Sequence, residues 1–251
     1  SPVMAASVEI ITHCWNYSRL LTYQLSSLML YPPDTATLVT VFATKTDTAT
    51  VDTVRWFGKA GVNVKLWLLP EAELKNRSIG RNLAARNTEA GVVWFTDADY
   101  LFGDGAINAL GGGVGRKLYR PESVKKQVAH ASGDEYIARV TEPKPYAINP
   151  LDFTPARVKR AIGGVQIVSG ETARRWGYLP TSKKHQAPYD GEHFKQSISD
   201  RAYRKELAAG GVDTSGKLFI PNVYRLRHSE SGVQARRGVG RRRPGDEVVR
   251  L

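Results

Sequence analysis

The first hundred residues alternate short apolar runs with longer segments in which apolar residues recur at helical spacing. The apolar runs are rich in β-branched residues and are bounded by polar residues, which is typical of buried strands. They span residues 8–13, 37–43, 62–69 and 92–96. The segments between them, residues 18–30, 50–60 and 74–88, are predicted helices. Strands that alternate with helices of this length predict crossover connections and a mostly parallel sheet.

The pattern is less regular after residue 105. We expect a helix over 121–131, irregular or short strands over 134–140 and 147–153, and strands over 165–168 and 217–226. Helices are predicted over 170–176 and 190–209, with a polar loop over 180–188 between them. Beyond residue 228 the composition turns to glycine, arginine and proline, which predicts a loose tail.

The composition is that of an ordinary globular protein. Of the 251 residues, 41% are hydrophobic and 24% are charged, which excludes a chain that is disordered or fibrous throughout. No run of 18 apolar residues and no basic-then-apolar leader occur, so the sequence predicts neither a membrane span nor a signal peptide. The single cysteine, Cys14, excludes an intrachain disulfide and a CxxC zinc site, and we expect a reducing, cytoplasmic location.

The chain is strongly basic, with 36 lysines and arginines against 24 acidic residues and a net charge of +12. A basic excess of this size favours a polyanionic ligand: a nucleotide diphosphate, a nucleic acid or an anionic surface. A charge that serves only solubility is the alternative. Part of the excess is local, because the segment from Arg225 onwards holds eight arginines and three acids.

Three polar clusters follow predicted strands of the first half, at residues 13–17, 44–47 and 97–99. Because ligands of open parallel sheets bind beyond the carboxyl ends of the strands, we expect these clusters to line a site. The first strand is not followed by GxGxxG, and GxxxxGK[ST] does not occur in the chain. A dinucleotide-binding fold and a P-loop NTPase are therefore both poor fits.

Asp97 and Asp99 form the most informative pair, since they lie two residues apart at the end of a predicted strand. In an extended turn both carboxylates reach the same side, where they would hold a divalent cation that keeps positions open for phosphate oxygens. The alternative is an Asx-rich turn in which Asp99 caps the following segment. The position directly after a strand of the alternating series favours the metal site.

Four segments in this order resemble the GT-A-fold glycosyltransferases, most nearly the family-2 nucleotide-sugar transferases: VEIITHCWNYSRLLTYQLSSL, RSIGRNLAARNTEAGVVWFTDADYLF, GGVQIVSGETARRWGYLP and YDGEHFKQS. The resemblance covers roughly residues 7–230. It implies a Rossmann-like α/β fold, with a mostly parallel sheet flanked by helices. It divides the chain into a nucleotide-sugar-binding half over 7–105, a smaller acceptor and catalytic half over 106–230, and a basic flexible tail over 231–251.

For the donor, the resemblance implies that Trp15 supports the nucleobase, in a turn that it forms with Asn16. The family often has an acidic residue after the second strand to read the base edge, and here either Thr44 or Asp47 takes that place. A UDP- or GDP-sugar is the donor that we expect first.

Two arginines and a glycine pair complete the expected donor site. Arg77 or Arg81 matches a family arginine that positions the nucleotide or its phosphates, a task suited to the planar guanidinium. Gly164, in the pair Gly163-Gly164, matches a position where a missing side chain lets the donor sugar approach the backbone. The whole expected donor-binding set is His13, Trp15, Asn16, Thr44, Asp47, Arg77, Arg81, Asp97 and Gly164.

For catalysis, Asp190 and Glu192 resemble the acidic pair at a helix start that supplies the general base, although a glycine separates them here. A helix cap is the alternative reading of these two acids. His228 resembles a C-terminal histidine that many GT-A enzymes use as a third metal ligand beside the two DxD acids, here Asp97 and Asp99. A neutral imidazole suits Mn²⁺ more than Mg²⁺, and both remain candidates.

Together these expectations describe a metal-dependent hexosyltransferase. It would move a sugar from a nucleotide diphosphate to an acceptor hydroxyl with inversion, and a retaining outcome stays open because the acidic match is inexact. The acceptor would be a glycan, a protein or a modified nucleic acid. The alternatives are a nucleic-acid-binding protein, whose arginine tail and basic body hold phosphates, and a glycosyltransferase whose acceptor is modified DNA.

Overall fold

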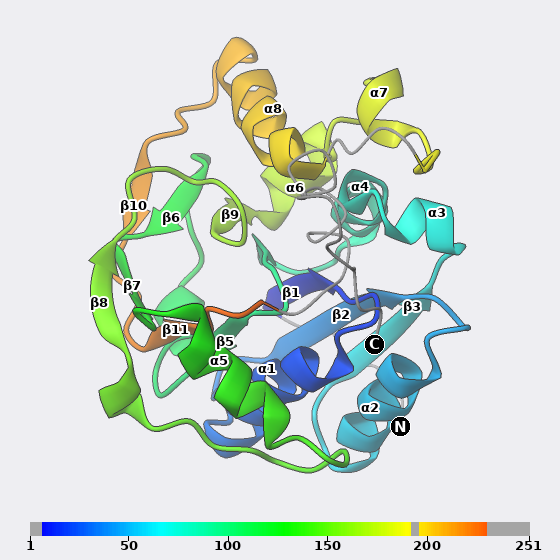
Figure 1. The fold of residues 1–251 in the computed structure, drawn as a ribbon. Coiled ribbons are helices and arrows are strands. Elements are labelled where there is room, and N and C mark those ends of the chain that lie inside the picture. The colour runs from blue at the N-terminus through cyan, green and yellow to red at the C-terminus, as the bar shows by residue number, and fades with distance from the viewer. Residues whose placement is uncertain (1–6, 192–195, 230–251) are drawn as a thin grey trace.

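The computed structural model describes residues 7–191 and 196–229, which form two sheets and their covering helices (Figure 1). The larger sheet has the strand order β10-β6-β9-β4-β1-β2-β3, and the smaller has the order β5-β11-β7-β8. The larger sheet consists of β1 (Val8–His13), β2 (Thr37–Ala43), β3 (Val64–Leu68), β4 (Val92–Phe95), β6 (Tyr119–Pro121), β9 (Gln166–Ser169) and β10 (Gly216–Leu218). The smaller sheet consists of β5 (Tyr100–Phe102), β7 (Ser123–Lys126), β8 (Thr154–Arg157) and β11 (Val223–Arg225).

Helices connect and cover these strands. They are α1 (Ser18–Leu30), α2 (Thr48–Lys59), α3 (Glu71–Leu74), α4 (Arg77–Asn87), α5 (His130–Ala138), α6 (Gly170–Trp176), α7 (Lys183–Gln186) and α8 (Gln196–Ala209). Two short 3₁₀ turns are η1 (Asn108–Leu110) and η2 (Pro150–Asp152). No helix in the described ranges is long and apolar enough to cross a membrane.

The mostly parallel sheet predicted from the sequence is confirmed. Strands β4, β1, β2 and β3 pair in parallel, whereas β9 runs antiparallel to its neighbours β4 and β6. Successive residues of β1 face opposite sides, so Ile10 packs with α1 and α2 while Ile11 packs with α4, α6 and α8. Because both faces are covered, β1 is buried throughout, including its polar residues Glu9, Thr12 and His13.

Strands from both expected halves share the larger sheet. β6, β9 and β10 come from residues 106–230 and extend the sheet that β1 to β4 begin. The division of the chain at residue 105 stays a prediction.

Two predictions for the second half were wrong. Residues 121–131 form β7 and the start of α5 rather than one helix, because β7 is held on both sides by β11 and β8, which are distant in sequence. Residues 134–140 lie largely in α5 instead of forming irregular structure or a short strand. Residues 147–153, expected as irregular structure or a short strand, are irregular apart from the 3₁₀ turn η2, which is capped by the Asn149 side chain.

Three further segments differ in detail from the prediction. The helix expected over 74–88 is α4, which begins at Arg77, and Leu74 instead ends the separate short helix α3. The polar loop over 180–188 contains the short helix α7. The last strand, expected over 217–226, is β10 and β11 in different sheets; Pro221, which has no N–H to donate, and Asn222, with φ of 55°, lie between them.

Candidate functional site

The candidate site lies where β1, β2 and β4 end. The turn that contains Asp97 and Asp99 follows β4 and leads directly into β5. The side-chain amide of Gln24, on α1, donates to the carbonyls of Asp97 and Tyr100 at 2.9 Å each, which fixes the turn to α1. The two acids are therefore held on a rigid support, as a binding site requires.

Two arginines of α4 neutralise Asp97. Nη1 of Arg77 lies 2.7 Å from Oδ1 of Asp97, and Nη2 of Arg81 lies 3.5 Å from the same oxygen. Both guanidinium groups are buried. Burial by itself would lower the pKa of Arg77, but Asp97 and other neighbours outweigh it and raise that pKa, so Arg77 stays charged.

Asp99 meets a different set of residues, from β11 and beyond. Its Oδ2 lies 3.3 Å from Nε of Arg225 and 3.6 Å from Nε2 of His228. Burial would raise the pKa of Asp99, but Arg225 and His228 outweigh it and hold the pKa below its usual value. The sequence-based pairing of Asp99 with His228 thus corresponds to a contact in the folded chain.

The residues around Asp99 fit a divalent metal ion in part. Oδ1 of Asp99 is buried and accepts no hydrogen bond from the residues that the structure describes. A carboxylate oxygen beside an imidazole nitrogen is a donor set suited to Mn²⁺. Within the described ranges, no three His, Cys, Asp or Glu side chains gather as a metal site. A metal at this place would therefore need further ligands, such as the phosphate oxygens of a substrate.

Asp200, on α8, belongs to the site although the sequence analysis did not select it. It is 6% exposed, and its Oδ2 accepts the N–H of Gly163 at 2.7 Å. Its Oδ1 lies 3.8 Å from Nη2 of Arg77. A signal was present in the sequence: Asp200, Tyr203 and Leu207 follow i, i+3, i+7 spacing, which places an acid on the buried face of the helix.

Gly163 and Gly164 lie directly against the acidic turn. A Cβ atom on Gly164 would come within 2.4 Å of the Tyr100 ring and 3.0 Å of the Asp97 amide nitrogen. Gly163 has φ of 61°, a left-handed conformation that favours glycine, and its carbonyl accepts from Nη2 of Arg81. The glycine pair thus lets the loop before β9 approach the Asp97 backbone closely.

At the end of β1, Trp15 packs into the protein rather than standing open. Its side chain is 4% exposed and belongs to the cluster beneath α3 and α4. The ammonium of Lys75 lies 4.1 Å from the centre of a Trp15 ring. Base stacking on Trp15 stays a prediction. It would require the Lys75 ammonium to move off the face of the ring or to occupy the opposite face from the base.

Asp47 holds the chain after β2 in place. Its Oδ2 accepts from the Asn16 amide at 2.8 Å and from the Thr50 hydroxyl at 2.6 Å, and Oδ1 accepts from the Thr50 amide at 3.3 Å. The carboxylate therefore caps α2 and fixes Asn16, whose φ is 62°. Thr44 is buried at the same strand end. Base recognition by Asp47 or Thr44 stays a prediction.

His13 lies beneath the two arginines. Its ring stacks on Phe42 with 4.8 Å between ring centres, and neither ring nitrogen has a hydrogen-bond partner among the described residues. Burial, together with the charges of Arg81 and Arg77, lowers the pKa of His13 well below its ordinary value. His13 is therefore neutral in the folded protein at pH 7.

The two acids predicted as general base are placed differently. Asp190 is exposed, just after Tyr189, whose amide donates to the Ala72 carbonyl at 2.8 Å. Glu192 lies outside the described residues. The choice between them stays a prediction, and Asp200 joins them as a third candidate.

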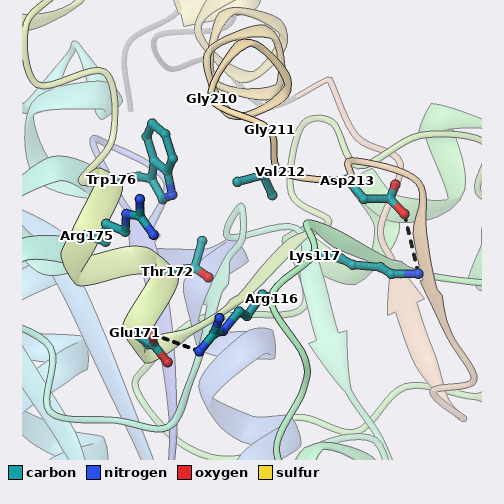
Figure 2. A pocket seen from close by; sticks show the side chains of 10 residues that line it. All are labelled: Arg116, Lys117, Glu171, Thr172, Arg175, Trp176, Gly210, Gly211, Val212 and Asp213. Atoms are coloured by element: carbon teal, nitrogen blue, oxygen red, sulfur yellow. Dashed lines mark ion pairs between the residues drawn. The ribbon is translucent and has the colours of Figure 1, made fainter.

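A pocket of about 290 Å³ lies elsewhere, beside α6 and the turn after α8 (Figure 2). The first residue of α6, Gly170, donates its N–H to the Gly91 carbonyl just before β4. The pocket is therefore near the amino end of β4, away from the acidic turn at the carboxyl end. Two exposed ion pairs line it, Arg116 with Glu171 and Lys117 with Asp213. None of the residues predicted for the site lines this pocket.

Comparison with known proteins identifies the fold. The mannosyltransferase PcManGT from Pyrobaculum calidifontis, solved in complex with GDP-Man and Mn²⁺, is 17% identical, with a TM-score of 0.52 over 93% of this chain and 60% of that one. This chain has the GT-A-like glycosyltransferase fold. TarS from S. aureus is 15% identical, with a TM-score of 0.52 over 89% of this chain and 37% of TarS. No protein-family model and no curated protein matches the sequence.

The resemblance drawn from four sequence segments is thus confirmed for the fold. The chain spans 60% of the length of PcManGT and 37% of that of TarS, so each of these chains contains parts that this one does not match. The roles of individual residues in a GT-A-like site stay predictions.

Proposed function

We propose that this protein is a metal-dependent hexosyltransferase that transfers a sugar from a nucleotide diphosphate donor to an acceptor hydroxyl. One observation carries the proposal: Asp99 and His228, selected from the sequence as metal ligands, approach within 3.6 Å beside the end of β4. Ligands of parallel α/β sheets bind at this edge. The GT-A-like fold and the GDP-Man and Mn²⁺ bound by PcManGT agree with it.

In this proposal Asp99 and His228 would hold Mn²⁺ or Mg²⁺. When bound, the metal would supply positive charge that stabilises the departing nucleotide diphosphate. Arg225 lies 3.3 Å from Asp99 and would move from the carboxylate toward the phosphates. Asp97, which is paired with Arg77, would orient that arginine rather than bind the metal directly.

The donor would lie across the carboxyl ends of β1 and β2. The nucleobase would lie near Trp15, and the sugar would approach the backbone at Gly164, where a side chain would collide with Tyr100. Arg77 and Arg81 are buried cations beside this path; both already donate to protein oxygens, so they would act on the phosphates through their charge. The donor base and the sugar are not assigned beyond the expectation of a UDP- or GDP-hexose.

The transfer step needs a base for the acceptor hydroxyl. As the base takes the proton, the hydroxyl oxygen forms a bond to the anomeric carbon, and the bond from that carbon to the diphosphate oxygen breaks. The diphosphate leaves with the bonding electron pair, and in-line attack inverts the anomeric centre. Asp190, Glu192 and Asp200 are the candidate bases; Asp200 is favoured by its buried place between Gly163 and Arg77.

A thermal-shift screen tests the function. UDP-, GDP-, CMP- and dTDP-sugars are each added with and without Mn²⁺, because a ligand that binds only the native state raises the melting temperature. We expect a metal-dependent shift with one nucleotide, and transfer or slow hydrolysis of that donor. No shift with any donor, together with tight, salt-sensitive binding to DNA or RNA, would favour the nucleic-acid-binding alternative instead.

A further inference from the structure

Acidic residues are unevenly distributed over this chain. Three stretches, residues 123–133, 153–170 and 214–229, contain eight of the 36 lysines and arginines and none of the 24 acidic residues. They supply β7, β8 and β11, which are three of the four strands of the smaller sheet. They also supply the loop that runs from β8 to Gly164. The smaller sheet and its connection to the candidate site therefore carry positive charge without intervening acids.

These stretches lead directly to the candidate site. Arg225 is the neighbour of Lys126 in the β11–β7 pair, and its Nε lies 3.3 Å from Asp99. The loop after β8 carries Lys159 and Arg160 and ends at Gly164, beside the acidic turn. Figure 1 shows β7, β8 and β11 on one side of the molecule, with β2 and β3 on the other. A second substrate would thus meet a basic surface on the side away from the expected nucleotide.

Four cations of this surface, which we name the basic rim, are Lys126, Arg157, Lys159 and Arg160. All four are exposed, and none forms an ion pair with an acid in the described parts of the chain. Three exposed lysines outside the basic rim do pair with acids: Lys117 with Asp213, Lys144 with Glu142 and Lys217 with Glu122. The charges of the basic rim are therefore not neutralised by neighbouring acids.

We propose that the basic rim binds an anionic glycan, which serves as the acceptor of the transferase. The inference rests on the proposed function and names its acceptor class: a polysaccharide with carboxylate, sulfate or phosphate groups. A single-stranded nucleic acid is disfavoured because stacking of successive bases needs several open aromatic rings. Of the three aromatic side chains in these stretches, Phe153 and Tyr224 are buried, and Phe219 alone is exposed.

Binding of defined polyanions to the full-length protein tests the basic rim. Fluorescently labelled alginate and dextran sulfate fragments are the probes, with neutral dextran as the uncharged reference. The variant is K159E/R160E, and the matched control is R55E/K59E, which reverses two exposed charges on α2. Both variants keep the arginine-rich tail and undergo the same change in net charge. Binding is measured by anisotropy over a range of salt concentrations.

We expect K159E/R160E to bind the anionic glycans about tenfold more weakly at low salt. The slope of log affinity against log salt concentration should also become shallower by about two, because two cationic contacts are lost. The affinity of the control R55E/K59E for the same glycans should change by less than about twofold, because its two charges lie outside the basic rim. Equal losses in both variants, or equal binding of neutral dextran, would overturn the proposal. Tighter binding of a single-stranded DNA of the same charge would assign the basic rim to nucleic acid instead.

The donor screen separates this inference from the proposed function. If K159E/R160E keeps the metal-dependent donor shift but loses the anionic glycan, both proposals are supported. A wild-type protein that binds donor but no anionic glycan would overturn the acceptor class and leave the transferase intact. A protein that binds the glycan but no donor would overturn the transferase, and with it the acceptor role of the basic rim.

Discussion

Nε2 of His228 lies 3.6 Å from Oδ2 of Asp99, where the chain beyond β11 passes the end of β4. The backbone sets up this approach. Arg225 is the ladder partner of Tyr100 in the antiparallel β11–β5 pair, and the Leu226 amide donates to the Asp99 carbonyl at 2.9 Å. A side chain two residues further on then reaches the carboxylate. The contact is thus a consequence of strand pairing, and it makes Asp99 the centre of the candidate site.

Asp99→Asn should remove the metal-binding charge and keep the shape of the side chain. We expect transfer to fall by roughly 100-fold or more, as for loss of one electrostatic group in an active site. The Mn²⁺-dependent part of the donor thermal shift should disappear. Asp104→Asn, a change at an exposed acid just beyond β5, is the matched control. Wild-type turnover and an unchanged metal response in Asp99→Asn would contradict the assignment of Asp99 as a metal ligand.

The three candidate bases are distinguished by separate variants, Asp190→Asn, Glu192→Gln and Asp200→Asn. We expect one of them to lose roughly 100-fold or more in kcat with near-normal donor binding, as for loss of a general base. Asp200→Asn keeps an acceptor oxygen for the Gly163 amide, so the loop before β9 should stay in place. Circular dichroism and the melting temperature check the fold of each variant. If all three retain wild-type kcat, the base is another group.

Gly80→Ala should destabilise the protein because α4 passes close over His13. A Cβ atom at residue 80 would come within 2.2 Å of Nε2 of His13, whose ring is held against Phe42. Overpacking of this kind costs about 1–3 kcal/mol in the free energy of unfolding.

Gly58→Ala on α2 is the control for this change, since its nearest neighbour would be Val64 at an ordinary 3.4 Å. The control should be neutral or stabilising by up to about 1 kcal/mol, owing to helix propensity. Urea unfolding measures both variants. Similar stability of the two would show that His13 moves aside freely.

His13 should make stability fall in mildly acidic solution. The pKa of His13 is lowered in the folded state, so below about pH 6.5 His13 is protonated in the unfolded chain but stays neutral in the folded chain. Stability is therefore fully present above this pH and declines as the pH drops toward the folded-state pKa. A single group contributes up to about 1.4 kcal/mol per pH unit over that window.

His13→Phe keeps a ring against Phe42 and removes the titration. Urea unfolding of both proteins from pH 8 to pH 5.5 measures the difference. The free energy of unfolding of the variant should decline less steeply below pH 6.5, while any difference at pH 8 reports packing alone. Parallel curves for the two proteins would mean that His13 takes up its proton equally well in the folded state.

The first half of the fold was predictable because its elements are determined locally. The strands over 8–13 and 37–43 are short, rich in β-branched residues and buried on both faces, as strands covered by helices on both sides are. The segment over 121–131 was wrongly predicted, since a short run with two lysines favours no structure strongly by itself. Pairing with β11 and β8 makes part of it a strand.

The candidate site was predictable where its residues follow strands, and less so elsewhere. Asp97 and Asp99 are marked by their position after β4, whereas Asp200 lies in the middle of α8 and is recognisable only from the buried face of that helix. Asp47 also follows a strand, as the sequence analysis expected. Its carboxylate oxygens accept hydrogen bonds from Asn16 and Thr50, which the sequence did not indicate.

The sequence by itself determined the alternation of strands and helices, the parallel sheet, the acidic pair at the end of β4 and the basic excess. Each of these depends on residues that are neighbours along the chain. Only the tertiary structure decided that Arg77 joins Asp97 to Asp200, and that parts of the three acid-free stretches pair as strands of the smaller sheet. Those contacts join distant segments, and their energies arise only after the strands have paired and the core has excluded water.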